Sequence, residues 1–211
     1  EDPIYKLKSV KNSSEIKNMI QAHKKDGLAL TKFIYWLKNV NRKNITEVYA
    51  QNKLERFRKM DQDYLYPSFN TIAGTGSNGA IVHYRATKKN TKNINLKDIF
   101  LCDSGGQYKY GTTDVTRTIC FSTQKQYIID TFTKVLKGHI AVALTNLNKD
   151  NTGKKIDIRA RRFLKKDGLD YAHGTGHGVG FFLNVHEGPQ SISKNNTIKI
   201  KKGMILSNEP G

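Results

Sequence analysis

The pattern of apolar and polar residues predicts helices near the start of the chain. Asn12 to Glu15 offers N-cap chemistry, and apolar side chains then recur at three- and four-residue spacing to about Asn39, as in one long amphipathic helix. Its apolar side consists of Ile16, Met19, Ile20, His23, Gly27, Leu30, Phe33, Ile34 and Leu37. We expect residues 1–12 to be extended, and His23 to be packed or half-buried rather than to bind a ligand.

A second helix is predicted from Thr46, with Glu47 in its first turn. We expect Val48, Leu54 and Phe57 to point inward. The basic residues of this segment would form its solvent-exposed side, namely Lys53, Arg56, Arg58 and Lys59.

The middle of the chain is typical of short strands between glycine-containing loops. Residues 80–85 form a strand-like run that contains His83. Residues 99–103 are a continuous apolar run ending in a carboxylate, as in a strand buried on both faces. Residues 114–121 begin with a carboxylate and alternate between polar and apolar side chains, which predicts a further strand.

Two more helices and a last strand are predicted in the second half. Residues 122–123 offer a cap for a helix to about Asn146, on which we expect His139 to be structural. Its predicted buried side holds Ile128, Phe132, Val135, Leu136, Ile140, Val142 and Ala143. A helix over 156–166 follows, with exposed Arg159, Arg161 and Arg162, and an apolar strand over 203–209 ends in a carboxylate.

Histidines and glycines gather between these last two elements. Three of the 6 histidines fall within residues 173–186, and four glycines lie among residues 174–180. That glycine density rules out a stable helix, so this is not the helical His-Glu-x-x-His site of zinc proteases. Glycines let the backbone approach a ligand closely while the imidazoles point at it.

Composition limits the alternatives. The formal net charge is +18, from 36 Lys and Arg against 18 Asp and Glu, but the lysines are scattered beside asparagines and no nucleic-acid motif accompanies them. No apolar run is long enough to span a bilayer. Cys102 and Cys120 are too few for a disulfide scaffold and are expected to be small core residues, as in a reducing compartment. We therefore expect neither specific nucleic-acid binding nor a membrane, and a cytoplasmic protein.

Three carboxylates stand at the ends of apolar strands: Asp103, Asp114 and Glu209. A carboxylate beside a core strand is costly without a cation, although a turn or a nearby Arg117 would also satisfy any single one. Together with clustered histidines, three of them suit Mn²⁺, Co²⁺ or Zn²⁺ in a carboxylate-bridged pair. Such a pair of ions can activate water and polarise a carbonyl, so the residues favour a metallohydrolase.

The motifs resemble a known family. These are the stretch from Asn78 to Tyr84, Asp103-Ser-Gly-Gly-Gln-Tyr, Gly111-Thr-Thr-Asp114-Val-Thr-Arg-Thr, His173-Gly-Thr-Gly-His177-Gly-Val-Gly through His186-Glu-Gly-Pro, and Asn208-Glu-Pro-Gly. Together they are similar to the catalytic domain of Xaa-Pro aminopeptidases (aminopeptidase P). The resemblance implies an α+β pita-bread fold, with pseudo-symmetric helices around a curved antiparallel sheet. It also implies release of the first residue from peptides with proline second, by attack of a metal-bridging hydroxide.

The resemblance also implies roles for individual residues. The metal ligands would be Asp103, Asp114, His177 and Glu209, with Asp114 bridging two ions, most simply Mn²⁺, and Zn²⁺ or Co²⁺ as alternatives. Glu209 would also serve as general base. The histidines that face the substrate, and act in catalysis with Glu209, would be His83, His173 and His186.

One departure from the family concerns the end of the chain. The family supplies a second bridging glutamate, and a basic residue of the proline pocket, beyond Glu-Pro-Gly. We therefore expect residues 1–211 to be a single catalytic domain that lacks its last strand and the family's N-terminal domains, and that is inactive or nearly so alone. The full-length protein is expected to be a homodimer.

Two other functions remain open at this level. A prolidase would use the same ligands to cleave Xaa-Pro dipeptides. A non-enzymatic module on this fold would bind peptides or nucleic acid, and the charge of +18 favours it, whereas the intact metal-ligand set argues against it. A digestive or vacuolar compartment is the alternative location, although acid would protonate the ligands and weaken metal binding.

Overall fold

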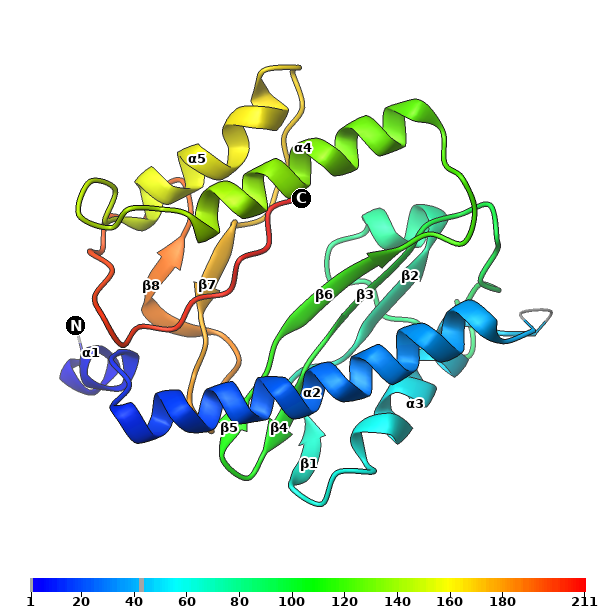
Figure 1. The fold of residues 1–211 in the computed structure, drawn as a ribbon, viewed down its shortest axis with the longest axis horizontal. Helices are drawn as coiled ribbons and strands as arrows, with labels where there is room; N and C mark the ends of the chain where they lie inside the picture. Colours follow the sequence, from blue (N-terminus) through cyan, green and yellow to red (C-terminus); the bar gives the residue numbers. More distant parts are fainter. Residues whose placement is uncertain (1, 42–43) are drawn as a thin grey trace. The chain divides into compact units, whose positions relative to one another are not determined.

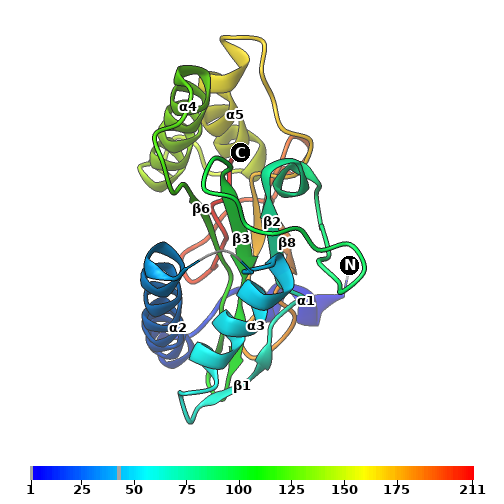
Figure 2. The same cartoon turned by 90° about the vertical axis from the view of Figure 1, so that its right-hand side faces the viewer.

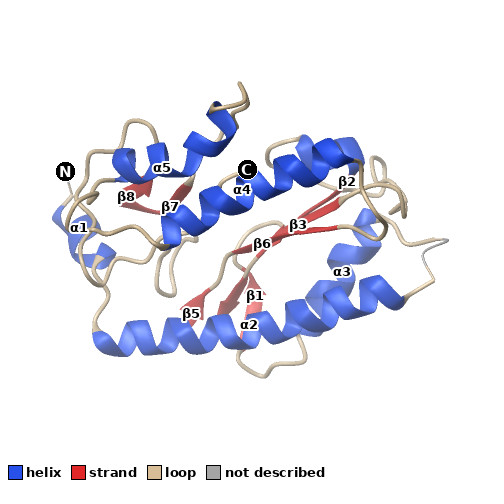
Figure 3. Cartoon of the chain, turned by 45° about the horizontal axis from the view of Figure 1, so that its top comes forward, coloured by secondary structure: helices blue, strands red, loops and turns tan. Residues whose placement is uncertain are grey.

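The structure is a computed structural model that describes residues 2–41 and 44–211. Groups of helices are followed along the chain by groups of short antiparallel strands (Figures 1 and 3). In chain order the elements are α1 (Pro3–Ser9), α2 (Ser13–Asn39), α3 (Glu47–Arg58), β1 (Tyr64–Pro67), β2 (Ile72–Thr75), the 3₁₀ helix η1 (Gly76–Ala80), β3 (Phe100–Ser104), β4 (Gly106–Tyr108), β5 (Gly111–Thr112), β6 (Val115–Ile119), α4 (Gln126–Ala143), α5 (Gly153–Lys165), β7 (Gly176–Gly178) and β8 (Glu187–Ile192).

These elements form two compact units. Unit 1 comprises the chain up to Ile16, residues 125–180 and residues 184–211, and unit 2 comprises residues 17–124 and 181–183. Each unit has its own strands and helices, so each positions its share of the candidate residues independently.

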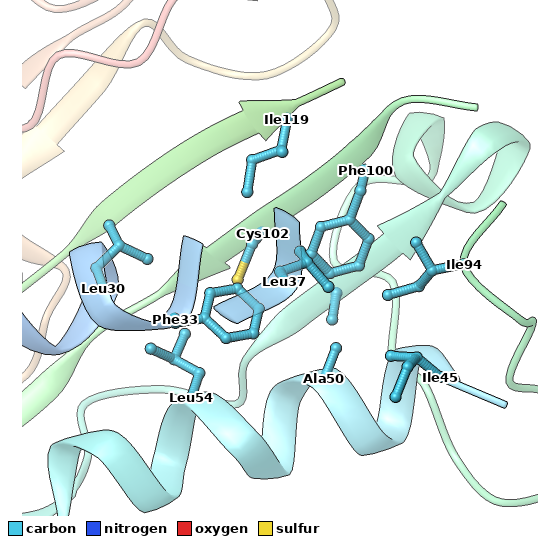
Figure 4. Packing of buried hydrophobic residues seen from close by; sticks show 11 residues of the cluster. Leu30, Phe33, Leu37, Ile45, Ala50, Leu54, Ile94, Phe100, Cys102 and Ile119 are labelled. Atoms are coloured by element: carbon cyan, nitrogen blue, oxygen red, sulfur yellow. The ribbon is translucent and has the colours of Figure 1, made fainter. Parts of the chain in front are cut away.

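Unit 2 contains a helix-on-sheet core. Its sheet has the order β2-β3-β6, all antiparallel, and β3 is the central strand. Helices α2 and α3 bury their apolar sides against it, as Figure 4 shows from close by. The buried cluster is Leu30, Phe33, Leu37, Ile45, Ala50, Leu54, Ala73, Ile94, Phe100, Cys102 and Ile119. The two predicted helices are therefore confirmed, including the cap in which Asn12 and Glu15 exchange hydrogen bonds. The strand predicted over 99–103 is also present, but only one of its faces is fully buried, because Leu101 and Asp103 are partly exposed.

A second small sheet of unit 2, with the order β1-β4-β5, follows directly from β3. Gly105 is the single residue between β3 and β4, and a Cβ there would lie 1.9 Å from the carbonyl oxygen of Thr113. Only glycine permits that approach. The residue after Thr113 is Asp114, so this close contact fixes the backbone that precedes a candidate metal ligand.

Unit 1 packs two helices over a two-stranded sheet. Helices α4 and α5 lie side by side in both views of the chain (Figures 1 and 2), and β7 pairs antiparallel with β8. A Cβ on Gly138 of α4 would lie 2.6 Å from the carbonyl oxygen of Ala160 on α5, so this glycine lets the helices cross closely. The predicted helices over 122–146 and 156–166 are confirmed with shifted ends: α4 begins at Gln126, not at residues 122–123, and α5 begins at Gly153.

The expectation of an extended segment over 1–12 is wrong. Residue 1 lies outside the described residues, so this correction concerns residues 2–12. Residues Pro3–Ser9 form α1, because the Asp2 side chain accepts a hydrogen bond from the amide of Ile4 and Pro3 suits the first helical turn. The helix also packs against β8: a Cβ on Gly188 would lie 2.6 Å from the ring of Tyr5. The cap and the packing against β8 thus stabilise a helix that the short, weakly patterned sequence did not predict.

Two predicted strands are also wrong. Residues 81–85 form a bend and turn rather than a strand, because His83 has a left-handed backbone with φ of +58°. The segment 203–209 forms isolated bridges rather than a regular strand, yet it is extended and hydrogen-bonded to β7 through Val179, Ser207 and Glu209.

Burial corrects several further expectations. Arg58 and Arg161, predicted on exposed helix faces, are 1% and 2% exposed. His23 is exposed rather than packed, and its Nδ1 lies 2.8 Å from the Met19 carbonyl oxygen. Cys102 is buried, which raises the pKa of its thiol to about 12, but Cys120 is exposed. On α4 the predicted buried side is in part exposed, at Phe132, Leu136, Ile140 and Ala143.

Among the described residues, no helix combines the length and apolar character needed to cross a membrane.

Candidate metal centre

The glycines of the histidine-rich stretch make room for close backbone packing around β7. A Cβ on Gly176 would lie 2.2 Å from the carbonyl oxygen of Ser207, and one on Gly178 would lie 2.4 Å from the side chain of Gln190. Residue 177 is therefore held between the C-terminal segment on one side and β8 on the other. These glycines serve packing, and they fix the strand from which the imidazole of His177 projects.

His177 and Glu209 face each other within unit 1. Nε2 of His177 lies 3.1 Å from Oε1 of Glu209. The Glu209 amide donates to the Thr175 carbonyl at 2.8 Å, and the Ser207 amide donates to the His177 carbonyl at 2.8 Å, so the two segments are in register. Both side chains are partly exposed, His177 at 20% and Glu209 at 33%, so solvent and small ligands reach them.

Ser207 joins the two residues. Its hydroxyl donates to Oε1 of Glu209 at 2.5 Å and accepts from the backbone amide of His177 at 2.9 Å. Burial alone would raise the pKa of the Glu209 carboxyl, but the His177 ring and the Ser207 hydroxyl outweigh it and hold that pKa below its usual value. The carboxylate is therefore kept ionised, as a metal ligand requires.

The donor set of unit 1 fits a divalent ion. Nδ1 of His177 lies 2.8 Å from the Gly178 carbonyl oxygen, to which it must donate. Nε2 of the same ring faces the Glu209 carboxylate, and a proton or a metal ion between them satisfies both. A ligating histidine that donates its other ring N–H to a carbonyl is the usual arrangement in metal sites.

Replacing Ser207 by alanine is expected to weaken metal binding about 10-fold to 100-fold, the usual cost of losing an outer-shell partner. The variant loses the hydroxyl that orients Glu209, while the backbone bonds between β7 and the last segment remain. Calorimetric titration with Mn²⁺ measures the effect. Ser193→Ala, which removes an equivalent hydroxyl from a loop after β8, serves as the control. Equal metal affinity in both variants would contradict the role given to Ser207.

The other two histidines of unit 1 occupy different settings. The ring of His186 packs edge-on against that of His177, with centroids 4.2 Å apart, so it lies directly beside the candidate ligand. His173 packs instead on Tyr171, and its Nε2 contacts the carbonyl oxygen of Gly211. The structure thus brings His177, His186 and Glu209 together and places His173 beside the last residue of the chain.

His173 is held by a buried charge cluster. Arg161 of α5 donates to the carbonyl oxygens of Tyr171 at 2.7 Å and His173 at 2.6 Å. The same guanidinium is paired with Asp157 at 2.9 Å and with Asp170 at 2.7 Å. These contacts of one guanidinium fix the backbone that leads into the histidine-rich stretch.

Asp170 is expected to make the stability of unit 1 sensitive to acid. Burial alone would raise the pKa of its carboxyl, but Arg161, the Tyr171 amide and Lys194 lower it to about 2. A lowered folded-state pKa stabilises the fold above the unfolded pKa, near 4, and that contribution is lost as pH falls toward 2. Because the carboxyl is about one-third exposed, we expect roughly 1 kcal/mol at neutral pH. Urea unfolding of Asp170→Asn should show this deficit at pH 7 and a smaller one at pH 3; a deficit independent of pH would contradict it.

In unit 2 the register of the sheet brings two carboxylates to one face. Asp103 of β3 pairs with Thr116 of β6, and Ser104 pairs with Val115. Asp114 is two residues before Thr116, so its side chain points to the same face as that of Asp103. Diagonal neighbours across an antiparallel ladder lie about 7–8 Å apart. Both residues are partly buried.

His83 lies apart from these carboxylates along the sequence and on a different kind of element. It is exposed, in the turn that follows η1, and its neighbour Tyr84 is buried. The structure therefore places His83 at the surface of unit 2.

Sequence reasoning missed Ser207 and Arg161. A signal existed for each: Ser207 is two residues before Glu209 on an extended segment and so shares its face, and Arg161 is four residues after Asp157 on the apolar side of α5. Neither residue stood out, because a lone serine and a helical arginine are ordinary on a surface.

Comparisons with known proteins agree with this chemistry. The model of metallopeptidase family M24 matches residues 17–211. A probable Xaa-Pro aminopeptidase P of Paracoccidioides brasiliensis is 45% identical over 99% of this chain and 35% of its own length. An uncharacterised peptidase of Schizosaccharomyces pombe is 47% identical over 99% of this chain and 36% of its own length. The chain thus spans about a third of these curated relatives.

Solved structures give the same result. An X-prolyl aminopeptidase of Caenorhabditis elegans, described as a cytosolic enzyme with a di-nuclear active site, matches with a TM-score of 0.91 and 34% identity over 99% of this chain and 34% of that one. The prolidase of Pyrococcus furiosus matches with a TM-score of 0.86 and 28% identity over 99% of this chain and 59% of that one. The predicted α+β pita-bread fold is confirmed, as is the resemblance to Xaa-Pro aminopeptidases. The chain belongs to metallopeptidase family M24.

Proposed function

We propose that this chain is the catalytic part of a metal-dependent aminopeptidase that releases the N-terminal residue from peptides with proline in the second position. Membership of family M24 supports a metallopeptidase. The observation that carries the proposal is the facing pair of His177 Nε2 and Glu209 Oε1, ordered by Ser207 and backed by the Gly178 carbonyl. Relatives named Xaa-Pro aminopeptidase P support the substrate class.

The ligands that we propose are carboxylates and one imidazole. Asp103, Asp114, His177 and Glu209 would be the residues that hold the divalent ions. Carboxylates with a single imidazole suit Mn²⁺, which we propose as the native metal, ahead of Zn²⁺ or Co²⁺. When bound, such ions polarise the scissile carbonyl and activate water for attack.

The residues of the chain would perform the remaining tasks. Glu209, kept ionised by its partners, would accept the proton of the attacking water as general base. His186, beside the ligand His177, and His83 and His173 would contact the substrate and stabilise the charge that develops on the carbonyl oxygen. An Xaa-Pro bond has no N–H, so the site must recognise it by shape and by its carbonyl group.

The test is release of the first residue from an Xaa-Pro-Pro peptide by the full-length protein, with and without Mn²⁺, beside His177→Ala. His23→Ala is the matched control, because His23 is an exposed histidine on α2. We expect metal-dependent release by the wild type and by His23→Ala, and none by His177→Ala. A folded wild-type protein that releases nothing with any divalent metal would overturn the proposal in favour of a non-enzymatic binding module.

A prolidase is the second candidate, because the Pyrococcus furiosus prolidase shares the fold of this chain with a TM-score of 0.86. Comparing an Xaa-Pro dipeptide with an Xaa-Pro-Pro tripeptide separates the two activities. We expect the tripeptide to be the better substrate, and faster cleavage of the dipeptide would favour the prolidase.

We further propose that the full-length protein is a cytoplasmic homodimer. The Caenorhabditis elegans relative is described as cytosolic, which supports the location. Subcellular fractionation and sedimentation of the purified protein test the two statements separately.

A further inference from the structure

A buried hydrogen-bond cluster includes Tyr84, the residue that follows His83 in its turn. Its centre is Glu47, the first residue of α3, whose side chain is fully buried. Its carboxylate accepts hydrogen bonds from the amide of Thr75 at 2.8 Å, the side chain of Asn78 at 3.0 and 3.1 Å, and the amide of Lys92 at 2.9 Å. Every partner is a donor, so the carboxylate acts purely as an acceptor.

Tyr84 is the member of this cluster that touches the turn. Its hydroxyl lies 2.9 Å from Oε2 of Glu47 and accepts from the side chain of Asn78 at 2.8 Å. Burial, and then the Glu47 carboxylate, raise the pKa of Tyr84 to about 12, so the hydroxyl stays protonated and donates. We assign the donation to Glu47 rather than to the Asn90 carbonyl, because a charged acceptor makes the stronger bond.

The cluster fixes the segments on both sides of the His83 turn. On one side, Asn78 lies in η1, which packs so tightly on β2 that a Cβ on Gly74 would lie 2.7 Å from the amide of Gly79. On the other side, the amide of Glu47 donates to the carbonyl of Lys92 at 3.0 Å, so the end of the loop is bonded to the start of α3. Glu47 therefore anchors the segment before the turn, the turn itself and the segment after it.

His83 has a backbone conformation that needs such support. Its φ of +58° is unfavourable for a residue other than glycine, and such outliers persist only where their surroundings fix them. Its side chain is exposed, whereas the side chain of the next residue, Tyr84, is 7% exposed and hydrogen-bonded. The turn itself is closed by the amide of Tyr84, which donates to the carbonyl of Ile81 at 3.1 Å.

We propose that Glu47, Asn78 and Tyr84 are positioning residues for His83. They hold a strained turn in the one conformation that presents the imidazole to the substrate. The inference rests on the proposed function, because it takes the substrate-facing role of His83 as given. Burying the Glu47 carboxylate costs free energy, because none of these contacts is a cation. That cost is explained if the cluster serves to keep the strained turn at His83 in one conformation.

A double-mutant cycle on the full-length, metal-loaded protein tests the inference. Tyr84→Phe removes only the hydroxyl and is combined with His83→Ala. Tyr64→Phe is the matched control, because the Tyr64 hydroxyl is also buried in unit 2 and donates to a carboxylate, that of Glu55, at 2.6 Å. Both kcat and KM are measured on an Xaa-Pro-Pro peptide, and metal content is measured for every variant.

We expect Tyr84→Phe to lower kcat/KM about tenfold with unchanged metal content, a size typical of residues coupled in one hydrogen-bond network. In the His83→Ala background the same change should cost nothing further, because its effect passes through His83. Tyr64→Phe should leave kcat/KM unchanged in both backgrounds. A loss of equal size with and without His83 would overturn the inference.

Hydrogen exchange provides a readout that does not depend on activity. The amides of Ile81 and Tyr84, both bonded within the turn, should exchange faster in Tyr84→Phe and at the wild-type rate in Tyr64→Phe. Unchanged exchange in Tyr84→Phe would overturn the inference even if the enzyme is active. An inactive wild type with faster exchange in Tyr84→Phe would reject the proposed function while upholding the anchoring of the turn.

Discussion

Replacing Arg58 by methionine is expected to lower the free energy of unfolding by about 3–5 kcal/mol, the cost of leaving a buried partner charge uncompensated. The partner is Asp26 of α2, which accepts from Arg58 Nε at 2.6 Å and Nη2 at 3.1 Å. Both side chains are almost fully buried, at 0% and 2% exposure. The Tyr108 hydroxyl, at 3.1 Å from Asp26, does not replace the lost cation.

Denaturant unfolding followed by circular dichroism measures this loss. Arg56→Met is the matched control, because Arg56 lies on the same helix and is exposed, and we expect it to change stability by less than about 0.5 kcal/mol. The double variant Arg58→Met/Asp26→Leu should recover most of the loss, since removing both charges avoids the unpaired one. Equal stability of Arg58→Met and Arg56→Met would contradict the buried pair.

The pair also contacts the residue that follows Asp103, a candidate metal ligand of unit 2. Nη2 of Arg58 donates to the hydroxyl of Ser104 at 3.0 Å, and Ser104 follows Asp103 on β3. We therefore expect Arg58→Met to weaken metal binding as well as folding, whereas Arg56→Met should alter neither.

Glu209→Gln is expected to lower the peptidase rate by about 10²–10⁴-fold, the usual contribution of a general base. The substitution keeps the shape of the side chain but removes its charge. The Ser207 hydroxyl still finds an oxygen to donate to, so the last segment should keep its hydrogen bonds to β7. The loss is therefore chemical rather than structural.

Raising the Mn²⁺ concentration separates the two roles of Glu209. A residue that only binds metal is rescued by excess metal, whereas a base is not. We expect the rate of Glu209→Gln to stay low at saturating Mn²⁺ and that of Ser207→Ala to recover. Full recovery of Glu209→Gln would show that Glu209 is a ligand without a role as base.

The helices of this fold could be read from the sequence because each repeats one period over several turns. In α2 the cap formed by Asn12 and Glu15 and the following apolar residues agree, so both its start and its end near Asn39 were predicted. Strands such as β4 and β5 have three and two residues. Such strands are too short for the alternation of polar and apolar side chains to repeat. Whether they form depends on pairing with neighbouring strands, which the local sequence does not reveal.

The burial of charged side chains was the feature that the sequence predicted least well. Arg58 and Arg161 occupy helix positions that a charge normally takes on the surface, and only the packed fold shows that Asp26 and Asp157 face them. The turn at His83 failed for a related reason. Its neighbours Ile81 and Val82 have strand-like side chains, and a long-range cluster around Glu47 overrides their preference.

The candidate ligands stay a prediction. Glu209 stood out because it ends an apolar segment, and His177 was assigned because its glycine-flanked motif resembles the family. Their supporting residues were not predictable in this way, since Ser207 and the Gly178 carbonyl gain meaning only once β7 and the last segment are hydrogen-bonded.

The most direct test of this account is to count the Mn²⁺ ions bound per chain by calorimetric titration of the metal-free, full-length protein. The wild type is compared with one ligand variant from each unit, Asp114→Asn and His177→Ala, and with His23→Ala as control. The account predicts two ions for the wild type and for His23→Ala, and weakened binding in both ligand variants. Identical stoichiometry and affinity in all four proteins would contradict a metal centre built from these residues.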